Sequence, residues 1–465
     1  MLQQFTIENF LSFKNKEVFN LMPSRGSRMK DHRAEPVKGH PILKTAAMFG
    51  PNAGGKSNFI KALNFCKNLV LVGTPSDSLI EHLPFQLDSK SKHNDTTFTF
   101  HILCNEKKYE YGFSYNQERI GREWLKIITK KDDVIIFDRD SDTSKFDLPY
   151  LMKLNPKEEE KQFLSFFAKA TPPRQLFLHE ILSRNIVDNV SDIEDPIAII
   201  HWFINNLKVL FPDTPYKQGG ILKAFSDDDL KSALESLLKY FDTGIEGVNL
   251  TDVDFDKLDI STELRKIIRT DLSKSGEKDT FGALRLDDNL YLITYVDNDV
   301  KAKKLQTLHK KLDEGGNAFF SFSDESDGTK RIFDYIPLIL DLIQGGKVFV
   351  IDEMERSLHP VLMKKLLNLF YEISNKTSTQ LFFTTHESTL LTQELLRRDE
   401  IWLMDKSKEG ISSFKRLDDK FNIRFDKELE KDYLKGLFGA IPKFESNDNI
   451  IETIRKFSNY QSNET

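Results

Sequence analysis

The chain has 465 residues, of which 39% are hydrophobic and 30% charged, and its formal net charge is −6. This length exceeds what one compact core usually holds, so we expect two or three domains of a globular protein. The acidic balance excludes a surface that is basic along the whole chain, and the presence of only two cysteines excludes a disulfide framework and a cysteine-rich zinc site.

The beginning of the chain shows no targeting signal. MLQQFTIENF alternates as a strand does and lacks the charged and apolar regions of an export signal. No stretch approaches the roughly 20 consecutive apolar residues that cross a bilayer. With so few cysteines, these features predict a cytoplasmic protein in a reducing compartment, without a membrane partner.

The residue pattern of 1–145 predicts strands around one helix. FTIENF and KEVFNLM predict a first strand pair, TAAMF a short buried strand, and KSNFIKALNFCKNLVLV a helix with apolar residues at helical spacing. TTFTFHILC, KKYEYGFSYN and REWLKIIT alternate apolar and polar side chains as antiparallel strands do. DRDSD, at 138–142, lacks the glycine and glutamate of a calcium loop, so we expect a hairpin turn there.

A glycine-rich loop joins TAAMF to the predicted helix. GPNAGGKS fits the pattern G-x-x-x-x-G-K-[ST], in which glycines let backbone N–H groups approach phosphate oxygens. The start of the helix presents further N–H groups and its positive dipole end to the same anion. Lys56 would reach the outer phosphates, and Ser57 would offer its hydroxyl to Mg²⁺. The candidate nucleotide-binding residues are Gly50, Pro51, Asn52, Ala53, Gly54, Gly55, Lys56, Ser57 and Asn58.

Residues 25–44 carry a local excess of basic side chains. Arginine and lysine outnumber Asp31 and Glu35 in this stretch. A solvated loop is the ordinary explanation of such a run, and a local nucleic-acid surface is the alternative.

Residues 146–285 change to a helical texture. KEEEKQFLSFFAKA, AIIHWFINNLKVLF, DDLKSALESLLKYF and STELRKIIRTDL place apolar residues at i, i+3 and i+4. The repeats do not persist as a long coiled coil requires. We therefore predict a helical insertion between two parts of one core.

Residues 286–445 return to strands and then alternate. NLYLITYVDNDVKAKKLQTLHKKL predicts a hairpin with DND as its turn. The strands KVFVI, TQLFFTT and EIWLMD are separated by helical stretches, which predicts a parallel sheet with crossover helices. Residues 446–465 are expected to form a short helix and a tail. The fold class is therefore α/β.

A carboxylate pair follows the predicted strand KVFVI. A strand points successive side chains to opposite faces, so Asp352 could hold Mg²⁺ through a water while Glu353 faces the attacking water as general base. An Asp-Glu pair at a strand end is by itself weak evidence for a catalytic site. The presence of the glycine loop in the same chain favours the catalytic interpretation.

At this point the chain resembles the ABC-type ATPases, in the branch that contains Rad50, SMC and OLD-family proteins. FSDESDGTKR is similar to their signature loop, with Ser326, Asp327 and Gly328 in its core. ERSLHP is similar to their D-loop, and FFTTHES to the strand end that carries a switch histidine. The resemblance assigns the residues Ser357 and His359 to the D-loop, His386 to the switch and Gln86 to the metal-binding Q-loop.

The resemblance can be narrowed further. IENFLSFKN, GPNAGGKSN, ESDGTKR, IDEMERSLHP, TTHE, RRDEIWLMDK and EKDYLKGLFGAIP together resemble AAA15-type ATPases of bacterial anti-phage and abortive-infection systems, such as the ATPase of PARIS-type or Abi-type immunity. It implies an ABC-type P-loop NTPase core with an antiparallel β lobe, a RecA-like parallel sheet and an inserted helical domain. YLKGLFGAIP has no chemical role that we can assign, and packing against the core is the simplest explanation.

The resemblance also implies how the protein works. In these ATPases the signature loop closes over nucleotide held by another subunit, so we expect ATP and Mg²⁺ between copies of a homodimer or higher homo-oligomer. No Toprim nuclease pattern follows His386. We therefore expect a separately encoded effector, such as a Toprim-type or other nuclease, and a trigger that is a phage protein, DNA ends or a metabolite.

Three alternatives remain open from the sequence. A Rad50-like or SMC-like DNA clamp or scaffold would use residues 25–44 and insertion lysines, but the acidic net charge disfavours DNA as partner. Transport would need coupling to a membrane domain. No residue separates ATP from GTP, and only the resemblance favours ATP.

Overall fold

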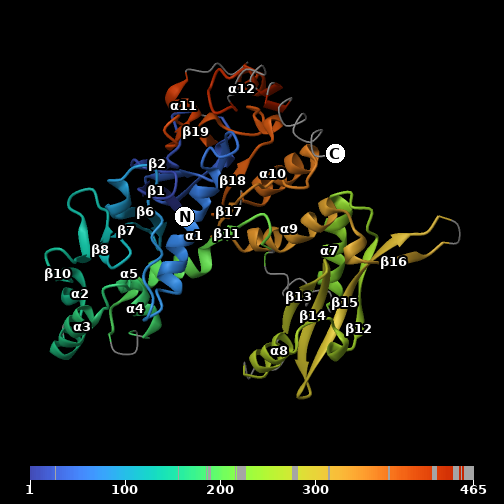
Figure 1. Ribbon diagram of the computed structural model, residues 1–465, viewed down its shortest axis with the longest axis horizontal. Helices are drawn as coiled ribbons and strands as arrows, with labels where there is room; N and C mark the ends of the chain where they lie inside the picture. Colours follow the sequence, from blue (N-terminus) through green and yellow to red (C-terminus); the bar gives the residue numbers. More distant parts are fainter. Residues whose placement is uncertain are drawn as a thin grey trace, which may run out of the picture.

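The computed structural model describes residues 1–454 apart from 27, 156, 185, 187–189, 215, 217–221, 223–226, 275–280, 313–314, 375–376, 422–426, 443–449 and 452. The described part comprises a main body and a smaller lobe that lies to one side of it (Figure 1).

A six-stranded sheet runs through the main body. Its order is β11-β17-β18-β5-β19-β20, and all neighbours are parallel except β20, which is antiparallel to β19. The strands are β5 (Thr45–Phe49), β11 (Leu207–Leu210), β17 (Val348–Ile351), β18 (Gln380–Thr385), β19 (Ile401–Lys406) and β20 (Ser412–Arg416). The predicted parallel sheet is thus confirmed.

Both faces of this sheet are buried. Ala46 and Met48 of β5 belong to one hydrophobic cluster, and Ala47 and Phe49 belong to a second cluster on the opposite face. The strands therefore read as continuous apolar runs rather than as alternating ones, as is usual for parallel sheets covered on both sides. The first cluster contains α1 (Lys56–Leu71), and the second contains α9 (Asp327–Gln344) and α10 (Pro360–Ser374).

A seven-stranded antiparallel sheet packs against α1. Its order is β10-β9-β8-β7-β6-β1-β2, and it confirms the predicted strand pair and the hairpin at 138–142. The strands are β1 (Leu2–Glu8), β2 (Glu17–Asn20), β6 (Thr96–Cys104), β7 (Lys107–Tyr115), β8 (Ile120–Ile127), β9 (Val134–Asp140) and β10 (Lys145–Asp147).

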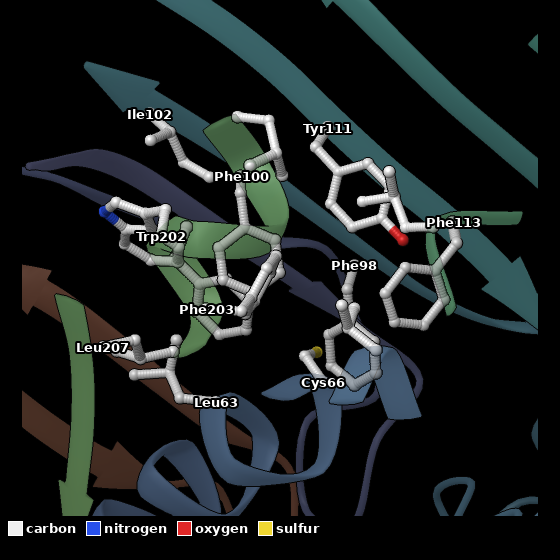
Figure 2. Close-up of a cluster of buried hydrophobic side chains, with 14 of the residues drawn as sticks. Leu63, Cys66, Phe98, Phe100, Ile102, Tyr111, Phe113, Trp202, Phe203 and Leu207 are labelled. Atoms are coloured by element: carbon white, nitrogen blue, oxygen red, sulfur yellow. The ribbon is translucent and has the colours of Figure 1, made fainter. Parts of the chain in front are cut away.

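Aromatic side chains fill the space between this sheet and α1 (Figure 2). Phe98 of β6 lies beside Cys66 of α1, and Phe100 of β6 and Tyr111 of β7 pack on Phe203. All five are fully buried. This packing fixes α1, and so the loop before it, on a rigid base.

The basic stretch 25–44 is ordered for the most part. It forms the hairpin of β3 (Arg33–Val37) and β4 (His40–Leu43). The ammonium of Lys44 is buried and donates to the carbonyl of Ser374 at 2.9 Å. At least this lysine therefore does not belong to a solvated loop.

The segment predicted as a helical insertion is only partly helical. It contains α2 (Pro149–Leu154), α3 (Glu158–Ala170), α4 (Phe177–Ser183), α5 (Glu194–His201), α7 (Asp228–Tyr240) and α8 (Thr262–Lys274). Besides most of β13 (Phe281–Leu286), it contains two strands that were expected to be helix or loop, β11 of the parallel sheet and β12 (Gly247–Val253). Pairing with β17 and β15, distant in sequence, makes these short runs strands.

The smaller lobe is built on a five-stranded antiparallel sheet. β12, β15, β14 and β13 form its path, and β16 pairs with the far end of β15. Its further strands are β13 (Phe281–Leu286), β14 (Asn289–Val296), β15 (Asp299–Lys310) and β16 (Asn317–Ser321). Asp297 and Asn298 both have positive φ, which confirms the predicted tight turn between β14 and β15.

The C-terminal part adds α11 (Leu417–Lys420) and α12 (Leu429–Leu434). The predicted helix and tail at 446–465 lie outside the described residues, except for four positions. None of the described helices combines the length and apolar character that a membrane crossing requires.

Candidate nucleotide site

The glycine loop turns sharply between β5 and α1. A Cβ on Gly50 would lie 2.4 Å from the carbonyl oxygen of Met404, so only glycine fits beside β19. Gly55 has φ +113° and Ala53 has φ +62°, which is left-handed backbone at the mouth of α1. The loop therefore opens α1 with its first N–H groups free of side-chain caps, ready for an anion.

Lys56 is folded onto this loop. Its ammonium donates to the carbonyls of Gly50 at 2.9 Å and Pro51 at 3.1 Å, and the residue is only 5% exposed. Burial lowers the pKa of Lys56 to about 8, although the carboxylates of Glu355, Asp352 and Glu353 oppose this shift. A bound phosphate would replace two neutral carbonyls with charged oxygens and would favour the protonated lysine.

Asn58 makes a structural contact. Its amide donates to the hydroxyl of Ser12 at 2.7 Å, and Ser412 of β20 donates to the same hydroxyl at 2.8 Å. These bonds tie α1 to the N-terminal segment and to the edge of the parallel sheet. The expected contact of Asn58 with nucleotide stays a prediction.

The Asp-Glu pair lies just beyond the end of β17. Asp352 is 3% exposed, and its carboxylate accepts a hydrogen bond from the Thr384 hydroxyl at 2.6 Å. The same Thr384 oxygen accepts from the N–H of Glu353 at 2.8 Å. Glu353 has φ +48°, so the backbone turns after the strand. The expectation that strand pleating separates the two side chains is corrected, since β17 ends at Ile351 and this turn orients them.

His386 directly follows β18, and its loop is held by a third carboxylate. The N–H of His386 donates to Oε1 of Glu355 at 2.6 Å. Partial burial and the charge of Lys56 lower the pKa of His386, against the effect of Glu355, Glu353 and Asp352. Neither Glu355 nor Thr384 could be singled out from the sequence, because each acts through a partner about 31 positions away along the chain.

These groups gather at the carboxyl ends of β5, β17 and β18. Ligands in open α/β sheets bind at this edge. Lys56, Asp352, Glu353, Glu355 and His386 influence one another electrostatically, which places them in one site.

The residues present suit Mg²⁺ that arrives with a nucleotide. Ser57 and Asp352 offer the hard oxygen ligands that the ion prefers. The described residues contain no group of three or more histidine, cysteine or acidic side chains able to hold a metal by themselves. Nucleotide-bound Mg²⁺ typically takes one or two protein ligands and completes its shell with phosphates and waters.

The structure does not join Gln86 to this site. Gln86 is exposed, and its amide donates to the carbonyl of Pro84 at 3.1 Å. Its neighbour Phe85 is held by Asn9. No hydrogen bond of Gln86 to Lys56 or Asp352 is present among the described residues, so its role in metal binding stays a prediction.

The signature-like loop is braced from both sides. Ser326 caps α9 by accepting from the N–H of Thr329 at 3.1 Å. Glu325 accepts from His309 of β15 at 2.7 Å. A Cβ on Gly328 would lie 2.9 Å from the carbonyl oxygen of Ser357, so the signature-like and D-loop-like segments touch within one chain.

The D-loop-like segment leads into α10. Ser357 has φ +62°, and the side chain of His359 accepts a hydrogen bond from the N–H of Val361 at 3.3 Å. His359 thereby contributes to the start of α10, and its expected part in the D-loop stays a prediction.

The segment YLKGLFGAIP packs on the core, as expected. Tyr433 contacts Phe49 at the end of β5 with ring centroids 6.3 Å apart, and its hydroxyl donates to Ala440 at 3.0 Å. Glu430 of α12 accepts from Ser388 at 2.9 Å. Through Glu430 and Tyr433, α12 therefore connects the loop after His386 with the strand before the glycine loop.

The profile of the AAA_21 family matches residues 46–169 and 219–392, more than half of the chain. This family is described as an AAA domain, putative AbiEii toxin, type IV toxin–antitoxin system. The chain belongs to the AAA_21 family. With its glycine loop, this AAA_21 protein is a P-loop ATPase.

Solved structures of SMC head domains are similar to this AAA_21 protein, although only weakly. An SMC head bound to the C-terminal winged-helix domain of ScpA has 12% identity and a TM-score of 0.39, covering 89% of this chain and 96% of that chain. The SMC head of Thermotoga maritima has 13% identity and a TM-score of 0.34, covering 89% and 98% respectively. These values are too low to transfer any function. A search of curated protein sequences finds no match.

Proposed function

We propose that this AAA_21 protein is an ATP-driven switch of a bacterial anti-phage system. Two copies hold Mg²⁺-ATP between them, and the nucleotide state of the pair holds or releases a separately encoded effector, for which a nuclease is the first candidate. Sensing of a phage-derived trigger would act on this nucleotide cycle.

The separation of two half-sites is the observation that carries the proposal. Lys56, Asp352 and His386 gather at one sheet edge, and their charges influence one another. Ser326 and Gly328 are held instead by α9 and the D-loop-like segment. Among the described residues, no hydrogen bond links the signature-like loop to the glycine loop. A second copy could supply that loop to the nucleotide.

The roles within the composite site follow from chemistry. Lys56 and the N–H groups at the start of α1 bind the phosphates, while Ser57 and Asp352 hold the magnesium ion. When bound there, the ion would supply positive charge to offset the charge that develops on the transferred phosphoryl group. Glu353 orients the attacking water and accepts its proton, and His386 contacts the terminal phosphate. Phosphoryl transfer needs such positioning more than it needs a protein nucleophile.

Support for a switch comes from contacts that connect the two half-sites inside one chain. Tyr335 of α9 donates its hydroxyl to the carbonyl of Met354 at 2.9 Å, one residue past Glu353. Gly328 abuts Ser357. A change at the Asp-Glu turn can therefore reach the signature-like loop of the same subunit, which would convert nucleotide state into subunit geometry.

ATP-dependent assembly of Glu353→Gln tests the proposal. This variant should bind ATP without hydrolysing it, so mass photometry should show dimers or larger assemblies with Mg²⁺-ATP and smaller species with ADP. Lys56→Met should remain as the smaller species both with Mg²⁺-ATP and with ADP. Co-purification with the product of a neighbouring gene, in one nucleotide state only, would support the effector. Identical masses in ATP and ADP would refute the switch.

A DNA clamp is the second candidate, and one hollow favours it. Arg25, Arg28, Arg397 and Arg398 line a cavity of about 230 Å³. Arg397 is paired with the buried Asp399, which offsets part of this positive charge. Binding of the ATPase to duplex DNA with steep salt dependence would support the clamp. Absence of DNA binding at low salt would exclude it.

A further inference from the structure

Glu355 occupies a position that the reaction, as described so far, does not use. It is the third acidic residue after β17, and its carboxylate joins two loops. Oε1 accepts from the backbone N–H of His386 at 2.6 Å, whereas the loop of Glu355 itself begins the D-loop-like segment. One carboxylate thus fixes the distance between the Asp-Glu turn and the loop of the switch histidine.

The second carboxylate oxygen of Glu355, Oε2, indicates that the site is incomplete. Oε2 is buried and has no hydrogen-bond partner among the described residues. A buried carboxylate oxygen without a donor is unfavourable, and such an oxygen calls for an explanation, of which a functional role is one. Lys56 and His386 lie near enough to Glu355 to feel its charge.

The electrostatic effect of Glu355 on its neighbours supports the same interpretation. Of the carboxylates that act on Lys56, Glu355 has the strongest effect, ahead of Asp352 and Glu353. It is also the strongest carboxylate influence on His386. Glu355 therefore acts on both of the groups that the proposed function assigns to the outer phosphate.

We propose that Glu355 is a positioning residue of the ATPase reaction, which holds the His386 loop against the Asp-Glu turn and directs Lys56 and His386 toward the terminal phosphate. It does not take the proton of the attacking water, a role that belongs to Glu353. Its carboxylate acts through His386 and Lys56. This inference rests on the proposed function of His386 as the γ-phosphate contact.

The proposed positioning role of Glu355 can be tested with two substitutions at this residue. Glu355→Gln keeps an oxygen that can accept from the His386 N–H but removes the charge, and Glu355→Ala removes both. We expect the alanine variant to lose at least tenfold in kcat while its Kd for a fluorescent ATP analogue changes less than threefold. The glutamine variant should recover part of this loss. Glu372→Gln, an exposed carboxylate of α10, is the matched control.

A double-mutant cycle with His386 decides whether Glu355 acts through the histidine. If it does, Glu355→Ala should slow His386→Ala little further, so that the two effects are far from additive. Fully additive losses, or wild-type kcat in Glu355→Ala, would overturn the inference. Melting temperatures separate these outcomes from unfolding, because a purely structural defect would reduce active protein without changing the kcat of the folded fraction.

The proposed function fails in a different way. Wild-type turnover in His386→Ala would remove the γ-phosphate role of the histidine whatever Glu355 does. Loss of turnover in His386→Ala together with unchanged turnover in Glu355→Ala would keep the switch and reject only the positioning role.

Discussion

At the scale of single residues, the site combines one buried cation with several carboxylates. Lys56 is buried with its ammonium bonded to carbonyls, and three acidic side chains lie near enough to act on its charge. Such a site is arranged for a ligand and not for stability, since the empty protein keeps a charge in a poorly solvated place.

Glu353→Gln should separate binding from hydrolysis. The amide cannot accept the proton of the attacking water, so turnover should fall by roughly 10²–10⁴ if Glu353 is the general base. The glycine loop is unchanged, and ATP binding measured by calorimetry should stay within a few-fold of the wild type. Turnover like that of the wild type would exclude Glu353 as the base.

Lys56→Met should stabilise the empty protein in a pH-dependent way. Because the pKa of Lys56 falls to about 8 in the folded chain, the buried charge opposes folding fully below pH 8 and less and less between pH 8 and 10.5. The shift corresponds to about 3 kcal/mol at pH 7. The gain in melting temperature over the wild type should therefore be largest near pH 7 and shrink above pH 8.

An exposed lysine on the same helix provides the control for this experiment. Lys61→Met should change the melting temperature little at any pH, since Lys61 is open to solvent on α1. An equal gain for both variants, or a gain at Lys56 that grows above pH 8, would contradict the assigned pKa.

Residue roles could be predicted from the sequence only where a local pattern carries them. Gly50, Lys56 and Asp352 stand in short motifs whose chemistry follows from the neighbouring residues. Thr384, which bonds to both Asp352 and Glu353, could not be found this way because its partners are 32 and 31 positions away. Glu355 could not be identified from the sequence for the same reason.

At the scale of elements, strand identity depends on distant partners. β5, β17 and β18 were predictable because each is an apolar run followed directly by a recognisable motif. β11 could not be predicted, since LKVL is short and lies in a stretch of helical spacing, and its pairing with β17 makes it a strand. The resulting sheet brings the carboxyl ends of β5, β17 and β18 to the site.

Gly328→Ala should disable the signature-like loop without affecting nucleotide binding. The added Cβ would stand 2.9 Å from the carbonyl of Ser357, so α9 or the D-loop-like segment must shift. A displacement of this kind should lower turnover roughly ten- to hundredfold. Gly282→Ala in β13 meets no atom within 4 Å and is the matched control. Equal turnover in both variants would argue against a role for this contact.

At the scale of the whole molecule, the two half-sites define what one copy lacks. The ATPase class followed from the order of motifs along the chain, whereas the smaller lobe around β12–β16 could not be predicted as a unit. Its strand β15 contacts the signature-like loop through His309 and Glu325, so the lobe can influence that loop. The assembled pair, not the single chain, is the unit that we expect to hydrolyse ATP.

Mixing two inactive variants tests this central claim most directly. Lys56→Met has a defective glycine loop and Gly328→Ala a defective signature-like loop, so a pair formed from one copy of each contains one intact composite site. Each mixed pair has one working site of two, so a mixture in which half of the pairs are mixed should recover about one quarter of wild-type turnover. No recovery in mixtures shown to contain mixed pairs would contradict ATP held between subunits.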